Sequence, residues 1–221
     1  MKPNNADWVL LKLAMAKKNR DLEMSMDGYL DERCSDFLRQ LKHDVDWCSD
    51  PKSFYEKEIP YRMENLATTD LRHITQMMSQ GYCNNLYWLQ KNLRSFGITK
   101  FEMPFKEYSL QSGDYKQGTL DLLDIHKARL YTRAGTLITA LCLSGFGTAL
   151  FIGSILFGAG AEELLFSNSR KSKDKILSIL PSIVESYKAQ MRLHIVEAIN
   201  EPCIAIINTL NNINYERNEL Q

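Results

Sequence analysis

The side chains best suited to chemistry are few and widely spaced. Asp121, Asp124 and His126 form the densest group of titratable residues, and on a helix Asp121 and Asp124 would share one face. Such a group could hold a metal ion or transfer a proton. One histidine and two carboxylates beside an apolar segment are, however, more typical of a solvated helix face, and we interpret the group in that way.

Known catalytic and metal-binding motifs are missing from the sequence. It contains no GxxxxGK[ST] phosphate loop, no GxGxxG turn, no GxSxG elbow and no HExxH helix. The cysteines are odd in number and form no Cys-x-x-Cys pair, which argues against a zinc site and against a disulfide framework. We therefore expect a protein without enzymatic activity, cofactor or metal, in which these thiols are reduced and mostly buried: Cys34, Cys48, Cys83, Cys142 and Cys203.

The charge balance bears on the class of partner. The 221 residues include 27 basic and 27 acidic side chains, so the net charge is zero. Nucleic-acid-binding proteins normally have a basic excess, and we predict no nucleic-acid partner. The apolar run from Trp8 to Ala16 is short and contains Lys12, so we interpret it as the start of an amphipathic helix rather than as a signal peptide.

The dominant feature is a stretch of 28 residues without charge, from Ala134 to Ala161. As one helix it would extend about 42 Å, more than the roughly 30 Å of a bilayer's hydrocarbon core. A helix this long and apolar on every side would need a larger protein around it. We therefore predict that it inserts into a membrane through its strongly apolar side chains: Leu137, Ile138, Leu141, Leu143, Phe146, Leu150, Phe151, Ile152, Ile155, Leu156 and Phe157.

Two membrane arrangements remain open for this stretch. In a single span, Gly145, Ala149 and Gly153 recur every four residues and would let another helix approach closely. In a re-entrant hairpin, residues 144–148 would form the bend. The flanks favour the hairpin, because basic residues are nearly equal on both sides, whereas a single span usually has an excess on one side. We predict that the flanking basic residues contact lipid headgroups: Arg129, Arg133, Arg170, Lys171, Lys173 and Lys175.

The N-terminal region, residues 1–97, has helical periodicity. Apolar residues at steps of three and four predict an amphipathic helix from Tyr29 to Cys48. Asp50-Pro51 is expected to close this helix, because the residue before a proline avoids the α conformation. A polar connector is expected over residues 52–60.

Two further helices are predicted in the same region. The first begins at Thr69 or Asp70 as N-cap and ends at Gly81. The second begins at about Asn84 and ends with Gly97 in the position of a C-cap glycine.

Residues 98–118 change from helical to alternating periodicity. Phe101, Met103 and Phe105 alternate with polar residues, which predicts a short strand. Residues 111–114 have turn composition, and residues 115–117 are candidates for the returning strand of a β-hairpin.

Helical periodicity resumes in a lead-in helix at residues 119–133 and again at residues 170–221. In the latter region an apolar stripe recurs every 3.7 residues or so, which disfavours a left-handed coiled coil and favours packing against the N-terminal helices. Pro181 is expected in the first turn of this helix, and Pro202 is expected to kink or divide it.

Two stretches resemble known families. Residues 93–98, Leu-Arg-Ser-Phe-Gly-Ile, followed by Met-Pro-Phe at 103–105, resemble the end of the helical region of GrpE-type nucleotide exchange factors, and residues 59–66 are loosely similar to the preceding helix. Residues 106–109 depart from the pattern of that family. The resemblance implies a β-wing after the helix, a DnaK-type chaperone as partner, and partner contacts at the matching positions: Leu93, Phe96, Gly97 and Phe105.

Residues 130–210 are similar in layout to the membrane paddle and returning stalk helix of bacterial dynamin-like proteins. They combine a glycine-rich apolar segment, a basic stretch and a long amphipathic helix. Without a GTPase domain, the chain would be at most a stalk-like partner of a dynamin-like GTPase. Helical pore-forming toxins share the same layout.

Together these features predict a mainly α fold, a helical bundle with a transmembrane helix or re-entrant helical hairpin and one short β-hairpin. The expected function is that of a membrane-associated or single-pass protein on the cytoplasmic face of a membrane, where it scaffolds or regulates partner proteins. A nucleotide exchange co-chaperone and a helical pore-former remain as alternatives, and a homo-oligomer stays open.

Overall fold

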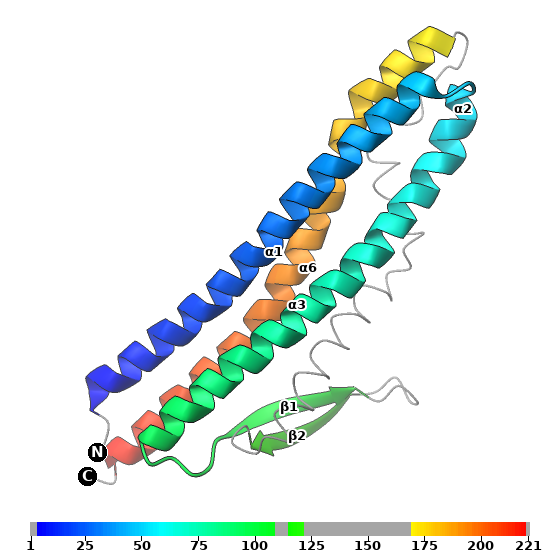
Figure 1. Cartoon of the computed structure of the whole chain (residues 1–221). Coiled ribbons are helices and arrows are strands. Elements are labelled where there is room, and N and C mark those ends of the chain that lie inside the picture. Colours follow the sequence, from blue (N-terminus) through cyan, green and yellow to red (C-terminus); the bar gives the residue numbers. More distant parts are fainter. Residues whose placement is uncertain (1–3, 109–114, 122–168, 220–221) are drawn as a thin grey trace. The chain divides into compact units, whose positions relative to one another are not determined.

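The computed structural model describes residues 4–108, 115–121 and 169–219. Over these residues the chain is mainly helical (Figure 1), as the sequence predicts, and its elements are as follows: α1 (Asn5–Trp47), α2 (Pro51–Ser53), the π-helix η1 (Phe54–Glu58), α3 (Ile59–Ser95), β1 (Glu102–Tyr108), β2 (Tyr115–Asp121) and α6 (Ser169–Glu219). The uncharged stretch and most of the lead-in region before it lie outside the described residues.

The described residues divide into two compact units. The first unit contains residues 4–25, 75–108, 115–121 and 195–219, and the second contains residues 26–74 and 169–194. Each of the three long helices therefore contributes one part to each unit.

Helix α1 begins with a reciprocal cap. The side chain of Asn4 accepts a hydrogen bond from the Asp7 amide (2.9 Å), and the Asp7 carboxylate accepts one from the Asn4 amide (2.8 Å). This capping box satisfies two backbone donors that a helix start otherwise leaves without a partner. From there α1 continues without interruption to Trp47, so the expected separate helices around residues 8–16 and 29–48 are one helix.

The polar connector expected over residues 52–60 is helical instead. Asp50 caps the new helix by accepting hydrogen bonds from the amides of Lys52 (3.1 Å) and Ser53 (3.2 Å), with Pro51 in the first turn. The next turn is π-helical, and the Ile59 amide bonds to the Phe54 carbonyl. The π-helical turn ends at Glu58, two residues before Pro60, which has no amide proton for the regular α pattern.

The helix start expected at Thr69 or Asp70 and the break expected between Gly81 and Asn84 are also absent, because α3 runs unbroken from Ile59 to Ser95. The carboxylate of Asp70 does not cap a helix; it is buried and bonded to two tyrosines. Gly81 lies inside α3, where a Cβ atom would overlap the Leu22 side chain of α1. The glycine therefore serves close helix packing rather than helix termination.

The end of α3 agrees with the sequence prediction. Gly97 has a φ of +75°, its amide bonds to the Arg94 carbonyl (3.0 Å), and the Ile98 amide bonds to the Leu93 carbonyl (3.0 Å). These two bonds define a Schellman motif, which requires a residue that tolerates positive φ. The chain then enters β1, which pairs antiparallel with β2 in a register from Glu102 opposite Asp121 to Tyr108 opposite Tyr115.

Helix α6 differs from its expected form in two places. It begins at Ser169, so Pro181 lies well inside the helix rather than in its first turn. Pro202 does not divide the helix, which continues to Glu219.

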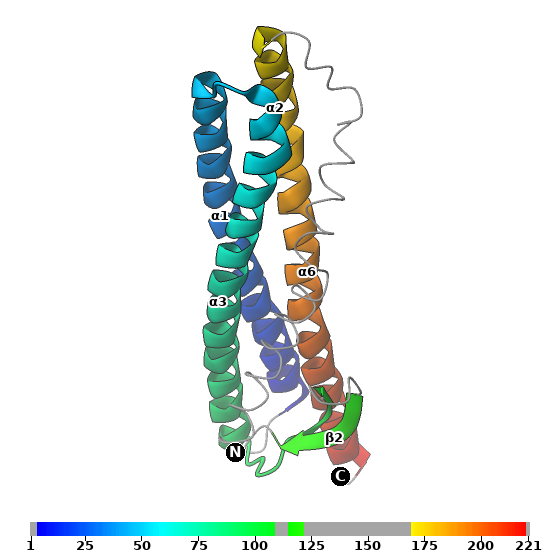
Figure 2. The same ribbon diagram turned by 90° about the vertical axis from the view of Figure 1, so that its right-hand side faces the viewer.

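In both units the apolar stripes of the long helices bury one another. In the first unit one cluster combines side chains from α1, α3, the segment after α3, and α6: Trp8, Leu11, Met15, Leu86, Leu89, Leu93, Ile98, Phe101, Ile206 and Leu210. In the second unit (Figures 1 and 2) the end of α1, the start of α3 and the start of α6 lie side by side, and the largest of their fully buried side chains include Met26, Leu30, Leu41, Ile59, Met63, Ile74 and Tyr187. The apolar stripe of α6 thus packs against the N-terminal helices, as its spacing predicts.

Candidate functional site

The most unusual polar group in the described residues is the carboxylate of Asp70, whose residue is 0 % exposed. It lies in the N-terminal part of α3, which belongs to the second unit. Tyr29 of α1 donates a hydrogen bond to one oxygen (2.8 Å), and Tyr187 of α6 donates to the other (2.7 Å). Arg33 of α1 approaches the first oxygen with Nε at 3.4 Å. Three helices therefore meet at one buried acceptor, which we call the Asp70 cluster (Tyr29, Arg33, Asp70 and Tyr187).

The surroundings keep the two tyrosine hydroxyls of this cluster protonated. Burial raises the pKa of both tyrosines above the ordinary value, and the neighbouring Asp70 raises it further, so both hydroxyls stay protonated donors at neutral pH. Burial, with a smaller contribution from Asp70, also raises the pKa of the Cys34 thiol to about 12. This thiol is therefore a poor nucleophile.

These protonation states favour a structural role for the Asp70 cluster over a catalytic one. A buried carboxylate needs hydrogen-bond donors, and here the donors come from two different helices. A shift of either helix along its axis would leave the carboxylate without one donor. We infer that the Asp70 cluster sets the register of α1, α3 and α6 in the second unit.

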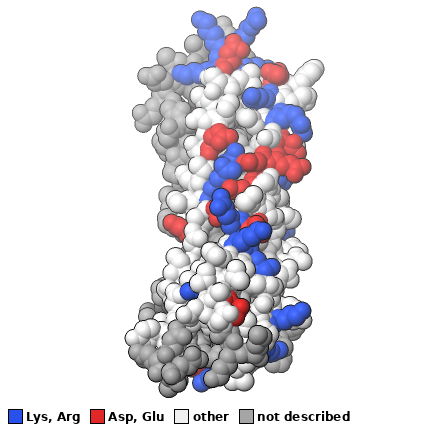
Figure 3. All heavy atoms as spheres, turned by 90° about the vertical axis from the view of Figure 1, so that its left-hand side faces the viewer, with Lys and Arg blue, Asp and Glu red and all other residues white. Residues whose placement is uncertain are grey.

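A second set of polar contacts joins α1 to α6 in the same unit. Lys188 pairs with Asp31 (2.8 Å), and Arg192 pairs with Asp27 (2.9 Å) and Asp31 (3.2 Å). The hydrogen bond from Lys188 lowers the pKa of Asp31, and the same bond raises the pKa of Lys188. Consistent with such pairing, acidic and basic side chains are interspersed on the face shown in Figure 3.

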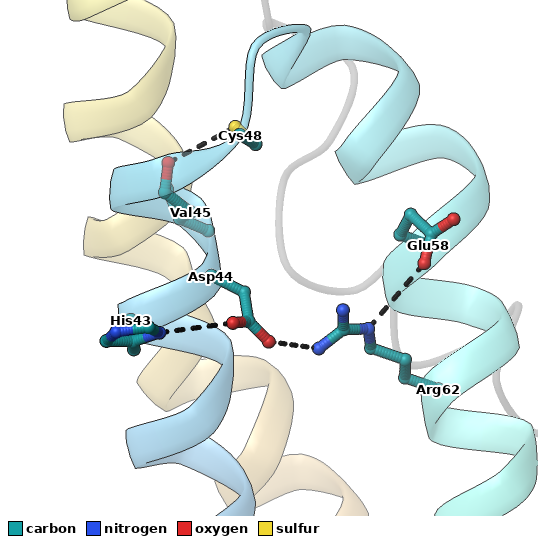
Figure 4. Close-up of polar contacts among 6 residues, drawn as sticks. All are labelled: His43, Asp44, Val45, Cys48, Glu58 and Arg62. Atoms are coloured by element: carbon teal, nitrogen blue, oxygen red, sulfur yellow. Dashed lines mark hydrogen bonds and ion pairs between the residues drawn. The ribbon is translucent and has the colours of Figure 1, made fainter.

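A third set of contacts joins α1 to the start of α3 (Figure 4). Arg62 points between Asp44, to which it donates a short hydrogen bond, and Glu58 at 3.6 Å, while His43 Nδ1 lies 3.2 Å from Asp44. Beside them an open hollow of about 440 Å³ is lined by Arg39, Gln40, His43 and Asp44. No nucleophile faces a base among these four residues, so the hollow has no catalytic arrangement.

The Asp44 pair predicts a pH dependence of stability. Hydrogen bonds from Arg62 and then His43 lower the pKa of Asp44 below its ordinary value. The stabilisation is therefore complete above the ordinary carboxyl pKa and is lost as the pH falls through the lowered one. We expect Asp44→Asn to flatten the acid limb, below about pH 5, of a plot of urea-unfolding free energy against pH. Asp21→Asn serves as the control, and an unchanged acid limb in Asp44→Asn would contradict the assignment.

The structure describes only part of the predicted site. The membrane-inserting residues from Leu137 to Phe157 lie outside the described residues, as do Arg129, Arg133, Asp124 and His126. Asp121 is the last residue of β2. In the part of the chain that is described, no helix is both long enough and apolar enough to cross a membrane. No group of three metal-ligating side chains occurs there either.

The basic residues in the first turns of α6 are described. Arg170 and Lys171 are exposed, and Lys173 and Lys175 are half-buried. The ammonium group of Lys173 donates a hydrogen bond to the Asp46 carbonyl near the end of α1 (2.8 Å). Most of these predicted headgroup contacts are therefore gathered at one end of the second unit, where α1 ends and α6 begins.

The predicted partner contacts have mainly structural surroundings. Leu93 is fully buried in the core of the first unit, and Phe96 packs against this core, with its ring centroid 5.7 Å from that of Trp8. Gly97 forms the Schellman motif, and Phe105 lies opposite Gly118 in the hairpin. None of the four described cysteines forms a disulfide; Cys34 and Cys203 are buried, Cys48 is half-buried and Cys83 is exposed.

Sequence reasoning missed the Asp70 cluster because it placed Asp70 at a helix end. A signal was available, since Asp70 occupies a position on the same stripe as Met63, Leu66, Ile74 and Met78. A carboxylate on an otherwise apolar stripe predicts a buried polar contact.

The described residues thus define a mainly helical protein with three long helices and a two-stranded hairpin. The chain matches no protein-family model, no curated protein sequence and no solved structure.

Proposed function

We propose that the protein is a non-enzymatic helical scaffold that attaches to a membrane through residues 134–161 and holds partner proteins there. The observation that carries the proposal is the uncharged stretch of 28 residues. Eleven strongly apolar side chains within it would contribute about −3 to −7 kcal/mol to insertion, at roughly −0.3 to −0.6 kcal/mol each near the bilayer centre.

The packing of the described helices supports this proposal. The apolar stripes of α1, α3 and α6 form well-buried cores with one another in both units. The described helices therefore bury their apolar stripes against one another. Lipid is a suitable environment for a further long run of apolar side chains.

Vesicle flotation tests the proposal. We expect the full chain to float with phospholipid vesicles and the variant Leu141→Asp/Ile152→Asp to lose flotation, because charges are costly in hydrocarbon. The control Tyr61→Asp/Leu193→Asp adds the same charge at side chains that are 63 % and 56 % exposed, and should float like the unmodified chain.

The same variant distinguishes lipid insertion from protein packing. In vesicle-free solution, Leu141→Asp/Ile152→Asp should unfold at nearly the same urea concentration as the control. A large loss of stability, or flotation equal to that of the unmodified chain, would contradict the proposal. Release of an entrapped dye from the vesicles would instead favour the pore-forming alternative over an anchor.

A second candidate function is nucleotide exchange on a DnaK-type chaperone. The observation in its favour is the order of elements, because a β-hairpin follows the long helix α3 directly after the stretch that resembles GrpE-type factors. This function predicts faster nucleotide release from such a chaperone. No acceleration at an excess of the protein would exclude it.

A further inference from the structure

An exposed aromatic side chain lies near basic side chains at one end of the second unit, where α1 ends and α6 begins. Trp47, the last residue of α1, is 80 % exposed. The hydrogen bond from Lys173 to the Asp46 carbonyl holds the beginning of α6 against this end of α1 (2.8 Å). Lysine and arginine side chains project at the corresponding upper end of Figure 3.

Charge at this end is predominantly positive on α6. From Ser169 to Lys175 the helix contains four basic residues and one acidic residue, Asp174. The acidic residues near this end include Asp46, which is exposed beside Trp47, and Asp50, which is engaged in capping α2. A positively charged surface with an exposed tryptophan has the composition of a membrane–water interface, where the indole ring sits at headgroup level and basic side chains attract anionic lipid.

The chain between the uncharged stretch and α6 is short, which limits how far this surface can lie from a membrane that the stretch enters. Ser169 follows Ala161 by eight residue steps, which span at most about 29 Å when the chain is fully extended. If the uncharged stretch enters lipid, the beginning of α6 must stay within that distance of the point where the chain leaves the hydrocarbon. Trp47 and the basic residues beside it are then within reach of the headgroups.

We propose that Trp47 together with Arg170, Lys171 and Lys173 forms a docking surface for an anionic phospholipid membrane. The inference rests on the proposed membrane attachment and deepens it, because it specifies which end of the second unit faces the lipid. Trp47 would insert its indole at the interface, and the basic side chains would bind anionic headgroups.

Binding of the full chain to vesicles measures this surface. On vesicles of phosphatidylcholine with phosphatidylserine, we expect Lys171→Glu to weaken binding roughly 10- to 30-fold. One charge near an anionic surface changes affinity about fivefold, and this substitution removes a positive charge and adds a negative one. Arg72→Glu, the same charge reversal at an exposed position of α3, should change binding less than twofold. The Lys171→Glu effect should disappear on vesicles of phosphatidylcholine alone.

Trp47 has an independent test. We expect Trp47→Ala to weaken binding about fivefold or more on both kinds of vesicle, whereas Leu193→Ala, at another exposed apolar side chain of the second unit, should not. Lipids with brominated acyl chains should quench the tryptophan fluorescence of the full chain, and Trp47→Phe should abolish this quenching, although Trp8 and Trp88 remain.

The outcomes separate this inference from the proposed function. If the full chain binds vesicles but Lys171→Glu and Trp47→Ala behave like their controls, the docking surface is wrong and the membrane attachment stands. If the full chain binds neither kind of vesicle, both proposals fail.

Discussion

Replacing Asp70 with alanine is expected to lower the free energy of unfolding by about 3–5 kcal/mol, because it removes one member of a buried, charged hydrogen-bond cluster. The hydroxyl of Tyr187, a residue that is 0 % exposed, would lose its acceptor, and so would the hydroxyl of Tyr29. Each unsatisfied buried donor costs about 1–3 kcal/mol. Urea denaturation followed by far-ultraviolet circular dichroism measures the loss.

Two further variants make the Asp70 prediction specific. Asp70→Asn keeps an acceptor oxygen in nearly the same shape and should cost less than the alanine substitution. Asp36→Ala removes a carboxylate from an exposed pair with Arg39 and should change stability by less than about 0.5 kcal/mol. If Asp70→Ala were as mild as Asp36→Ala, the three helices would not depend on this carboxylate for their register.

Replacing Trp8 with alanine is expected to cost a similar amount, about 3–5 kcal/mol, for a different reason. The Trp8 side chain is 2 % exposed and belongs to the core cluster of the first unit, beside the ring of Phe96. Alanine would leave a cavity that the surrounding leucines cannot fill without moving. The loss should appear in urea denaturation of the full chain.

Leu10 provides the matched control for Trp8. It lies two residues further along α1, but 63 % of it is exposed, so Leu10→Ala should change stability by less than about 0.5 kcal/mol. Equal effects of the two substitutions would show that the face of α1 assigned to the core is wrong.

Helical periodicity predicted the type of most described elements, because steps of three and four mark the buried face directly. The stripe of α6, with Ile176, Leu180, Val184 and Tyr187, is buried as its spacing predicts. The hairpin also follows its pattern, although β2 extends to Asp121 rather than ending near Gln117. A glycine at the end of a helical pattern predicted the C-cap at Gly97, since few other residues adopt its positive φ.

The helix boundaries were less predictable, because residues that usually end helices have other roles here. Asp70 accepts tertiary hydrogen bonds, Gly81 admits the Leu22 side chain, and Pro60 follows a π-helical turn that keeps the helix continuous. Local preference favours a break at each position. Tertiary packing overrides this preference in α3.

The Asp70 cluster depends on contacts between distant parts of the chain, and a single sequence does not reveal which helices meet. Tyr29 is 41 residues from Asp70, and Tyr187 is 117 residues away. The same holds for Trp47, whose place beside the basic start of α6 follows from a bond over 127 residues. The basic residues themselves were predictable from local composition alone.

Hydrogen exchange of the full chain, with and without phosphatidylcholine–phosphatidylserine vesicles, tests membrane attachment most directly. Peptides covering residues 134–161 should exchange more slowly when vesicles are present, because amides in hydrocarbon are shielded from water and hydrogen-bonded within the chain. Peptides from the buried parts of α1 and α3 should exchange at the same rate in both samples. Unchanged exchange over residues 134–161 in vesicle-bound protein would contradict insertion of this stretch.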